Sequence, residues 1–283
     1  MIISIASGKG GTGKTTVAVN LALSLNGDVQ FLDCDVEEPN AHIFLKPNIT
    51  QRQSISIPVP KVDESKCTYC GKCQEVCAYS AIAVLKDKIL VFHQLCHGCG
   101  GCSLFCHEKA IEETRREIGI IQIGKSETGG FVNGQLNISE PMSPPLIRAV
   151  KKRAQEHKNT RAQVTIIDAP PGTSCPVIES IKGSDYCVLV TEPTPFGLND
   201  LILAVEVVRK LKIPFGVIIN RADIGDNKVE LYCQGNKIPV LMRLRFDKEI
   251  AILYSKGIPL VSKKNDYQDK FLSMFKQIKK FGE

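Results

Sequence analysis

Cysteine is the residue type whose spacing points most directly to chemistry in this chain. Eight of the 12 cysteines fall within 40 residues, in two copies of the pattern C-x2-C-x2-C-x3-C. Three closely spaced thiolates can bind three corners of an iron–sulfur cubane, and the fourth, further along the chain, then binds the other cluster. The pattern predicts two [4Fe–4S] clusters, the first on Cys67, Cys70, Cys73 and Cys106 and the second on Cys77, Cys96, Cys99 and Cys102.

Zinc is the main alternative occupant of these cysteines, because tetrathiolate zinc sites also use C-x2-C pairs. Two equally spaced quartets fit zinc ribbons poorly, and the segment resembles a bacterial two-cluster ferredoxin. Ala78 and His107 stand where that family has a proline after the fourth cysteine. We expect four-thiolate ligation without His97 or His107, and altered hydrogen bonding and solvent access near the sulfurs.

A glycine-rich string near the N-terminus carries a second kind of chemistry. Residues 8–15, GKGGTGKT, match the phosphate-binding pattern G-x-x-x-x-G-K-[ST]. Glycines there let backbone N–H groups surround phosphates, and the following helix adds its positive end. We expect Lys14 to contact the β- and γ-phosphates and Thr15 to bind Mg²⁺. The predicted nucleotide-binding residues of this loop are Gly8, Gly10, Gly11, Thr12, Gly13, Lys14, Thr15 and Thr16.

Four segments resemble one family of ATPases. They are SGKGGTGKTT (7–16), FLDCDVEEPN (31–40), IIDAPPGT (166–173) and VIINRAD (217–223). They are similar to the deviant P-loop group that includes MinD, ParA, Mrp-type iron–sulfur carriers and the nitrogenase iron protein. The resemblance implies that Lys9 reaches the phosphates bound by a second subunit, in a homodimer or a heterodimer with a related ATPase.

The resemblance also implies roles for single residues. Asp35 is expected to orient or couple to the attacking water, and Asp168 to meet Mg²⁺ through water. Gly172 is expected to sense the γ-phosphate, and Asn220 to contact the adenine. The catalytic candidates are therefore Lys9, Lys14 and Asp35, and the magnesium candidates are Thr15, Asp35 and Asp168. For Asp33 we favour helix or turn capping over catalysis.

The elements around these motifs predict an α/β fold. Unbroken apolar strands are predicted at 2–6, 29–32, 164–167, 186–190 and 215–219, and they alternate with helices. One helix follows the glycine loop and would end at Gly27, and others are predicted at 146–155 and 198–211. Such strands are typical of a mostly parallel sheet covered on both faces, here a P-loop NTPase. Residues 124–134, rich in glycine and poor in apolar residues, are expected to form a mobile connection.

The α/β alternation stops between about residues 62 and 116, where residues 67–82 align with residues 96–111 at an offset of 29. We therefore predict a discontinuous ATPase domain, residues 1–60 and 117–283. A small inserted α+β ferredoxin-like iron–sulfur domain would comprise residues 61–116. A surface connection tolerates such an insertion, because loop-closure entropy grows slowly with length.

Cys175 follows Asp168 by seven residues, on a segment that nucleotide would move. In the nitrogenase iron protein a cysteine at this offset binds a cluster shared across the dimer axis. That protein needs a second cysteine per subunit, and none lies between Cys106 and Cys175 here. A functional switch II thiol and a buried structural thiol both remain open. Cys34, Cys187 and Cys233 are interpreted as core or surface thiols.

Composition narrows the partners and the location. A net charge of +6, no tryptophan and 6% aromatic residues argue against nucleic-acid binding. We expect a cytoplasmic protein, because the N-terminal residues do not have the pattern of an export signal and no apolar run approaches a membrane span. A predicted amphipathic C-terminal helix carries an apolar stripe, which we expect to pack on its own domain rather than on a membrane. The stripe is formed by Phe271, Met274, Phe275, Ile278 and Phe281.

Three functions are compatible with these motifs, all with ATP or ADP, Mg²⁺ and two [4Fe–4S] clusters. The preferred one is a slow, partner-stimulated ATPase whose dimer changes drive electron transfer through the clusters to a redox protein. The first alternative is an ATPase carrier or scaffold for iron–sulfur or metallocofactor assembly, although the C-terminal C-x-x-C that is usual in Mrp-type carriers is missing. The second alternative is a MinD-like positioning ATPase with redox-sensing clusters.

Overall fold

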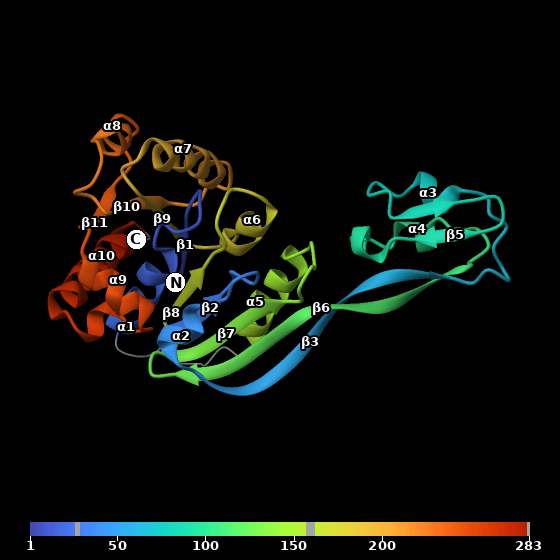
Figure 1. The fold of residues 1–283 in the computed structure, drawn as a ribbon, viewed down its shortest axis with the longest axis horizontal. Coiled ribbons are helices and arrows are strands. Elements are labelled where there is room, and N and C mark those ends of the chain that lie inside the picture. Colours follow the sequence, from blue (N-terminus) through green and yellow to red (C-terminus); the bar gives the residue numbers. More distant parts are fainter. Residues whose placement is uncertain (26–28, 157–161, 282–283) are drawn as a thin grey trace.

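A nine-stranded sheet organises the chain in the computed structural model, which describes residues 1–25, 29–156 and 162–281 (Figure 1). The strand order is β11-β10-β9-β1-β8-β2-β7-β6-β3. The first seven strands in this order run parallel: β11 (Val240–Leu244), β10 (Phe215–Asn220), β9 (Tyr186–Thr191), β1 (Ile2–Ala6), β8 (Val164–Asp168), β2 (Val29–Asp33) and β7 (Gly129–Leu136). The predicted mostly parallel α/β fold is confirmed.

Helices cover both faces of the parallel strands (Figure 1). One face is covered by α1 (Lys14–Ser24), α2 (Ala41–Leu45), α9 (Lys248–Ser255) and α10 (Asn265–Lys280), and the other by α5 (Pro144–Glu156), α6 (Cys175–Ile181), α7 (Pro195–Lys210) and α8 (Lys228–Gly235). Neighbouring strand residues such as Phe31 and Leu32 point to opposite faces and are both buried. The strands are continuously apolar because both of their faces are covered.

The amphipathic C-terminal helix α10 packs on the ATPase core. Phe271, Met274 and Ile278 are fully buried in the same apolar cluster as residues of α1, and Phe275 is nearly so. The expectation that this stripe packs on its own domain is confirmed for these four residues, whereas Phe281 is exposed. Among the described residues, no helix has the length and apolarity needed to cross a membrane.

Strands β3 (Asn48–Val62) and β6 (Ile111–Ser126) form an antiparallel arm that leaves the sheet (Figure 1). They pair along their whole length, but β7 pairs with β6 only from Gly119 onward. The arm beyond the sheet therefore comprises residues 56–62 and 111–118, about 23 Å at roughly 3.3 Å per residue. Because Gly119 pairs with Leu136 at the carboxyl end of β7, the arm projects from the edge of the sheet that also carries the glycine-rich loop.

Residues 63–110 at the tip of the arm, hereafter the insert, fold as two copies of one unit. The elements are α3 (Lys72–Glu75), β4 (Ile82–Val84), β5 (Ile89–Val91), the 3₁₀ turn η1 (His93–Leu95) and α4 (Gly101–Leu104). Positive backbone φ angles at Tyr69, Gly71 and Ser80 recur 29 residues later at Gly98, Gly100 and Lys109. The pairing of Ile82 with Val91 likewise repeats that of Ile111 with Val62. The sequence repeat is thus also a structural repeat.

Two sequence-based boundaries take a different form in the structure. The domain limits expected at 60–61 and 116–117 fall inside the continuous strands β3 and β6. The expectation of a mobile connection at residues 124–134 is wrong, because β6 continues to Ser126 and β7 begins at Gly129. Its glycines allow close packing instead, since a Cβ on Gly124 would lie 2.3 Å from the Asn48 carbonyl oxygen. Gly27, expected to end α1, lies outside the described residues.

Candidate functional site

The glycine-rich loop joins the end of β1 to α1, which begins at Lys14. Gly11 and Gly13 have φ angles of 76° and 96°, a left-handed conformation that favours glycine. Gly8 packs closely on α7, where an added Cβ would lie 2.2 Å from the Asp200 carbonyl oxygen. The loop is therefore held in a bent conformation in which Lys14 and Thr15 are almost completely buried.

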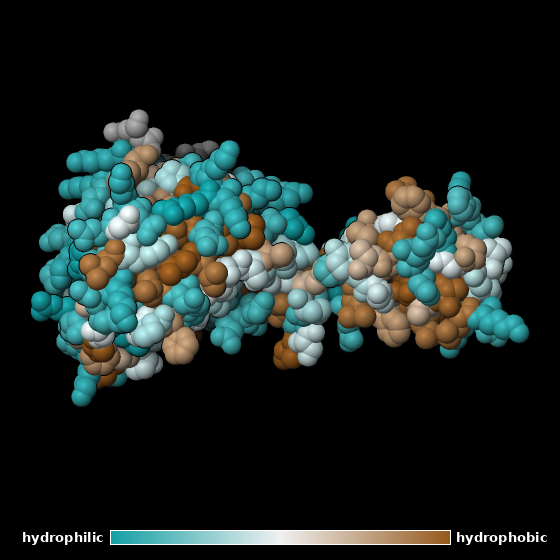
Figure 2. Space-filling view, turned by 90° about the horizontal axis from the view of Figure 1, so that it is seen from above, coloured by the Kyte–Doolittle hydropathy of each residue, from teal (hydrophilic) through white to brown (hydrophobic). Residues whose placement is uncertain are grey.

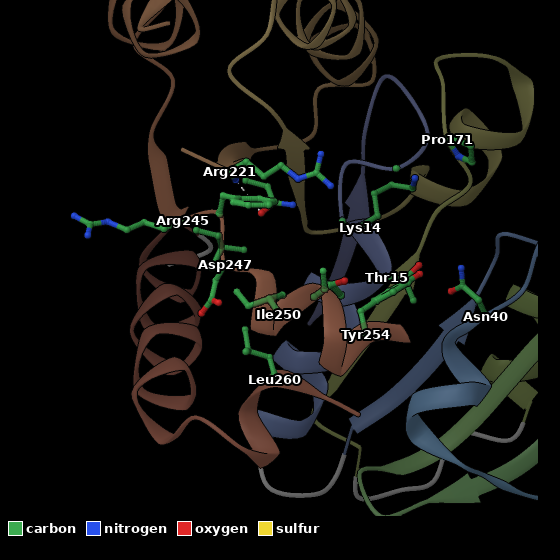
Figure 3. Close-up of a pocket in the computed structure, with 18 of the residues that line it drawn as sticks. Lys14, Thr15, Asn40, Pro171, Arg221, Arg245, Asp247, Ile250, Tyr254 and Leu260 are labelled. Carbon is green, nitrogen blue, oxygen red and sulfur yellow. Dashed lines mark hydrogen bonds between the residues drawn. The ribbon is translucent and has the colours of Figure 1, made fainter. Parts of the chain in front are cut away.

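A cavity of about 420 Å³ opens beside this loop (Figure 3). Its phosphate end is lined by Gly10, Gly11, Gly13, Lys14, Thr15 and Thr16, with Asp35 and Pro171 nearby. Asn220 lines the other end, and its Nδ2 donates a hydrogen bond to the Thr12 carbonyl at 2.9 Å. The structure thus brings six of the eight predicted loop residues, Asp35 and Asn220 around one space, whereas Gly8, Thr12, Asp168 and Gly172 are not among the residues that line it.

The residues of the far wall of the cavity are not among those predicted from the sequence. It is formed after β10 and β11 and in the C-terminal helices, by Arg221, Arg245, Phe246, Asp247, Ile250, Tyr254 and Leu260 (Figure 3). No spacing pattern marks these residues, because they come from separate segments that only the sheet order brings together. A flat apolar group next to a phosphate chain fits such a wall.

Asp168 is the most unusual charged group of the site. It is fully buried at the end of β8, and its two carboxylate oxygens have no hydrogen-bond partner among the described residues. Burial raises the pKa of Asp168 to about 7, and the Thr15 hydroxyl and the charge of Lys14 oppose this shift. Unpaired oxygens beside a threonine hydroxyl suit a hard cation such as Mg²⁺, so the residues present fit the implied metal.

Burial also shifts the pKa values of the neighbouring charged groups. It raises the pKa of Asp35 to about 6, with Lys14 acting in the opposite direction. It lowers the pKa of Lys14, against the attraction of Asp168 and Asp35. Burial also raises the pKa of Asp33, and this carboxylate accepts backbone hydrogen bonds that oppose the shift, from Asp35 at 3.2 Å and from Ala41, the first residue of α2, at 3.0 Å. The capping role expected for Asp33 is confirmed.

The protonation of Asp168 predicts how stability depends on pH in the absence of nucleotide and Mg²⁺. Its raised pKa means that the unfolded chain loses this proton first, so the free energy of unfolding should fall as pH rises from about 4 to about 7. Burial also raises the pKa values of Asp33 and Asp35, so Asp168→Asn should reduce this fall rather than abolish it, and should raise the free energy of unfolding at pH 8 by about 1–3 kcal/mol. Urea unfolding at pH 5 and pH 8 tests this, and a variant no more stable than wild type at pH 8 would contradict it.

Gly13 offers a test of the loop geometry. In Gly13→Ala the new Cβ would lie 2.7 Å from Asn220 Nδ2, at a φ that alanine rarely adopts. We expect the nucleotide-free protein to lose about 1–3 kcal/mol of unfolding free energy. Gly10→Ala is the matched control, since a Cβ there meets nothing within 4 Å, and it should change stability by less than about 0.5 kcal/mol. Equal losses in the two variants would refute the loop geometry.

Lys9 lies outside the residues that line the nucleotide cavity. Its Nζ is 3.5 Å from a carboxylate oxygen of Glu192, which also pairs with Arg221 at 3.1 Å. The side chain of Lys9 is 32% exposed, whereas that of Glu192 is 9% exposed. Within one chain Lys9 therefore pairs with the loop between β9 and α7, and its contact with a second subunit stays a prediction.

The segment after β8 carries Gly172 and Cys175. Gly172 has a φ of 100° and its N–H donates to the Ser7 carbonyl at 3.0 Å, which ties this segment to the start of the glycine loop. Cys175 is the first residue of α6 and is exposed, so the alternative of a buried structural thiol is wrong. Cys34, Cys187 and Cys233 are buried, and burial raises the pKa of all three thiols.

The eight remaining thiols surround two hollows in the insert. One is lined by Cys67, Cys70, Cys73 and Cys106, and the other by Cys77, Cys96, Cys99 and Cys102. Each hollow therefore takes three cysteines from one repeat and one from the other. Among the described residues, no three His, Cys, Asp or Glu side chains are placed to hold a single metal ion.

Backbone amides point at one pair of sulfurs in each quartet. The N–H groups of Tyr69 and Gly98 donate to Cys67 and Cys96 Sγ at 3.4 Å, in equivalent positions of the two repeats. Those of Ala81 and Ala110 donate to Cys77 and Cys106 Sγ at 3.3 Å. Such N–H···S bonds stabilise thiolates and tune the potential of iron–sulfur clusters. A hollow with four thiols and directed amides fits the implied clusters.

The sheet, the glycine loop and the buried carboxylate at a strand end define a P-loop nucleotide-binding protein. The match to a family model agrees with this: residues 3–260 match the CobQ/CobB/MinD/ParA nucleotide binding domain, and the chain belongs to that family. The resemblance to the MinD and ParA group is thereby confirmed for the α/β part of the chain.

Individual relatives and solved structures agree with this assignment. An uncharacterized protein of Methanocaldococcus jannaschii is 33% identical over 91% of this chain and 90% of its own length. An iron–sulfur cluster carrier protein of Pyrococcus horikoshii is 24% identical over 99% of this chain and 88% of its own length. The solved septum site-determining protein MinD of the same organism, in complex with Mg-ADP, covers 98% of this chain and 95% of its own at 20% identity with a TM-score of 0.57, which shows the shared fold.

Proposed function

We propose that this chain is an ATPase of the MinD/ParA type that holds two [4Fe–4S] clusters in its insert and uses its ATP cycle to carry iron–sulfur clusters. The observation that carries this proposal is the pairing of a nucleotide cavity with two complete thiol quartets in one chain. Relatives named iron–sulfur cluster carrier proteins, which align with almost the whole chain, support the carrier role over the electron-transfer role preferred from the sequence.

ATP hydrolysis is assigned to the buried charges of the cavity. Lys14 would neutralise the β- and γ-phosphates, while Thr15 and Asp168 would hold Mg²⁺ with Asp35 nearby. The bound Mg²⁺ would neutralise charge on the phosphate oxygens. Asp35, placed at the cavity with a pKa of about 6, would orient the attacking water. Asn220 and the apolar wall from Phe246 to Leu260 would bind the base.

Dimerisation is part of the proposal because Lys9 lies outside the cavity of its own chain. If the Lys9 ammonium left the Glu192 carboxylate and bound a phosphate held by the partner, its positive charge would be better compensated, because phosphate carries more negative charge. Gly172, tied to Ser7, would transmit the presence of the γ-phosphate to α6 and Cys175. We propose a homodimer as the simplest form, with a cluster-accepting or redox protein as its partner in the cytoplasm.

Cys175 is the proposed contact for a transferable cluster. It is exposed at the start of α6, whereas the eight quartet thiols are committed to two resident clusters. Two copies of Cys175 would supply two thiolates in a dimer, and the acceptor or a small thiol would supply the rest. Because the C-x-x-C of Mrp-type carriers is missing, the carrier function depends on Cys175.

Electron transfer is the second candidate, favoured by the geometry of the quartets. Four thiols and directed backbone amides describe clusters that stay in place and have tuned potentials. Under this function, MgATP should change the reduction potential of the clusters or the rate at which they reduce an external acceptor.

One anaerobic experiment separates these functions. Protein loaded with about eight iron atoms per chain is supplied with one further labelled cluster and mixed with an apo-ferredoxin, with and without MgATP. Under the carrier function the label moves to the acceptor, and Cys175→Ser prevents this while the resident iron stays constant. Transfer that is absent in wild type, together with an ATP-dependent potential, would replace the carrier function by electron transfer.

A further inference from the structure

The arm places the insert beside the edge of the sheet that would face a second subunit. It continues β3 and β6 beyond the carboxyl ends of β7 and β2, and the glycine loop follows the carboxyl end of β1 in the same sheet. A subunit reached by Lys9 must lie over this edge. With the arm extending about 23 Å past the edge, such a subunit would lie alongside the insert.

The two repeats of the insert present different surfaces. The second repeat exposes four large apolar side chains, grouped hereafter as the apolar face: Phe92, Leu95, Leu104 and Phe105, with 46%, 51%, 81% and 50% of their surface accessible. The first half of the insert exposes two, Tyr79 at 45% and Leu85 at 51%, and Tyr79 stacks on the His97 ring. The residues 29 positions before those of the apolar face are Asp63, Lys66, Glu75 and Val76. Since the two repeats have the same backbone conformation, this difference does not arise from the fold of the unit. A concentration of exposed apolar residues in one half indicates a binding surface.

Both repeats contact the arm, the first through the apolar cluster of Cys73 and Ile82 with Val62 and Ile111, and the second more closely. A Cβ on Gly98 would lie 3.0 Å from the Pro58 carbonyl oxygen, and one on Gly100 would lie 2.9 Å from a Glu113 carboxylate oxygen. Cys96 packs against the same core cluster as Ile57 and Val59. The apolar face therefore belongs to the repeat that packs more closely on the arm, and a narrow neck joins the insert to the larger body (Figure 2).

The ATPase body of the same chain offers matching apolar residues at this edge. Ile138, in the connection that follows the carboxyl end of β7, is 99% exposed. Phe196, near the start of α7 and four residues after Glu192, is 79% exposed. Both follow strands at their carboxyl ends, as the glycine loop does. A second copy of this chain therefore offers exposed apolar residues at this edge that the apolar face could contact.

We propose that the apolar face of each insert docks on the ATPase body of a second copy of this chain in the nucleotide-bound dimer. The inference rests on the proposed function for the existence of that dimer. Two-fold symmetry would form the contact twice, with each arm reaching over its partner. The clusters of one subunit would then lie against the nucleotide-binding body of the other, so that ATP binding determines which surface the clusters face.

The test introduces the same residue at equivalent positions of the two repeats. Leu104→Lys changes the apolar face, and Glu75→Lys changes its counterpart 29 residues earlier, which is exposed and makes a surface ion pair with Lys72. Ile138→Lys changes the opposing surface. Iron-loaded protein is examined anaerobically by sedimentation velocity with MgATP, and iron content and circular dichroism verify folding. Phe105→Lys replaces Leu104→Lys if the latter loses iron.

We expect Leu104→Lys and Ile138→Lys to weaken the MgATP-dependent dimer at least about 10-fold, and Glu75→Lys less than about 2-fold. If wild type dimerises and Leu104→Lys dimerises equally well, the inference is overturned and the proposed function stands. If wild type never dimerises with MgATP, the proposed function fails and the inference fails with it. Normal dimerisation combined with lost transfer to an acceptor would assign the apolar face to that acceptor and overturn the inference.

Discussion

Lys14→Ala is expected to lower ATP hydrolysis at least about 100-fold and to abolish measurable MgATP binding. Lys14 is 6% exposed and is the first residue of α1, so its ammonium is fixed at the phosphate end of the cavity. Asp168 and Asp35 are its charged neighbours, and its loss leaves the buried Asp168 and the half-buried Asp35 facing the phosphates without compensation. Hydrolysis and equilibrium binding of a fluorescent ATP analogue measure the two effects.

Two further lysine variants make this result specific. Lys276→Ala, at an exposed position of α10, should leave both quantities unchanged. Lys9→Ala should retain nucleotide binding, because Lys9 pairs with Glu192 outside the cavity, but should lose dimer-dependent hydrolysis. Full ATPase activity in Lys14→Ala would overturn the assignment of the cavity. A loss of binding in Lys9→Ala would instead place Lys9 in the site of its own chain.

The second large effect concerns which cysteines share a cluster. Cys106→Ser should remove the first cluster and keep the second, although Cys106 belongs to the second repeat. Cys77→Ser should do the reverse. Iron content should fall from about eight to about four per chain in each single variant. The reason is geometric, since each hollow takes its fourth thiol from the opposite repeat.

Electron paramagnetic resonance of the reduced variants identifies the cluster that remains. Cys106→Ser and Cys73→Ser should give one spectrum, and Cys77→Ser and Cys102→Ser another. Cys187→Ser is the control, because this thiol is buried in the ATPase body far from the insert in sequence and structure. Matching spectra from Cys106→Ser and Cys102→Ser would show that each repeat binds its own cluster and refute the crossed assignment.

Several features of the site are predictable from sequence because they depend on short stretches of chain. The conformation of the glycine loop follows from the steric freedom of Gly11 and Gly13. The three closely spaced thiols of each quartet lie within seven residues, and the backbone repeats that arrangement at an offset of 29. Strands that are apolar throughout predict a sheet covered on both faces, which the structure confirms.

Other features depend on which strands lie side by side, and sequence spacing does not encode this. The wall from Phe246 to Leu260 reaches the cavity only because β10 and β11 are neighbours in the sheet. The mistaken connection at residues 124–134 has the same origin, since its glycines serve contacts with other strands.

The sequence by itself determined the class of protein, the phosphate loop and the two thiol quartets, because glycine conformation, strand apolarity and ligand spacing are local properties. Only the tertiary structure decided that Asp168 is buried without a partner, that Lys9 pairs with Glu192 and that Cys175 is exposed. It also decided that the arm leaves at the nucleotide edge, with the apolar face in the repeat that packs more closely on the arm. These follow from strand order and register, which are set by contacts between segments distant in the sequence, such as Ile2 with Thr165 and Asn48 with Lys125.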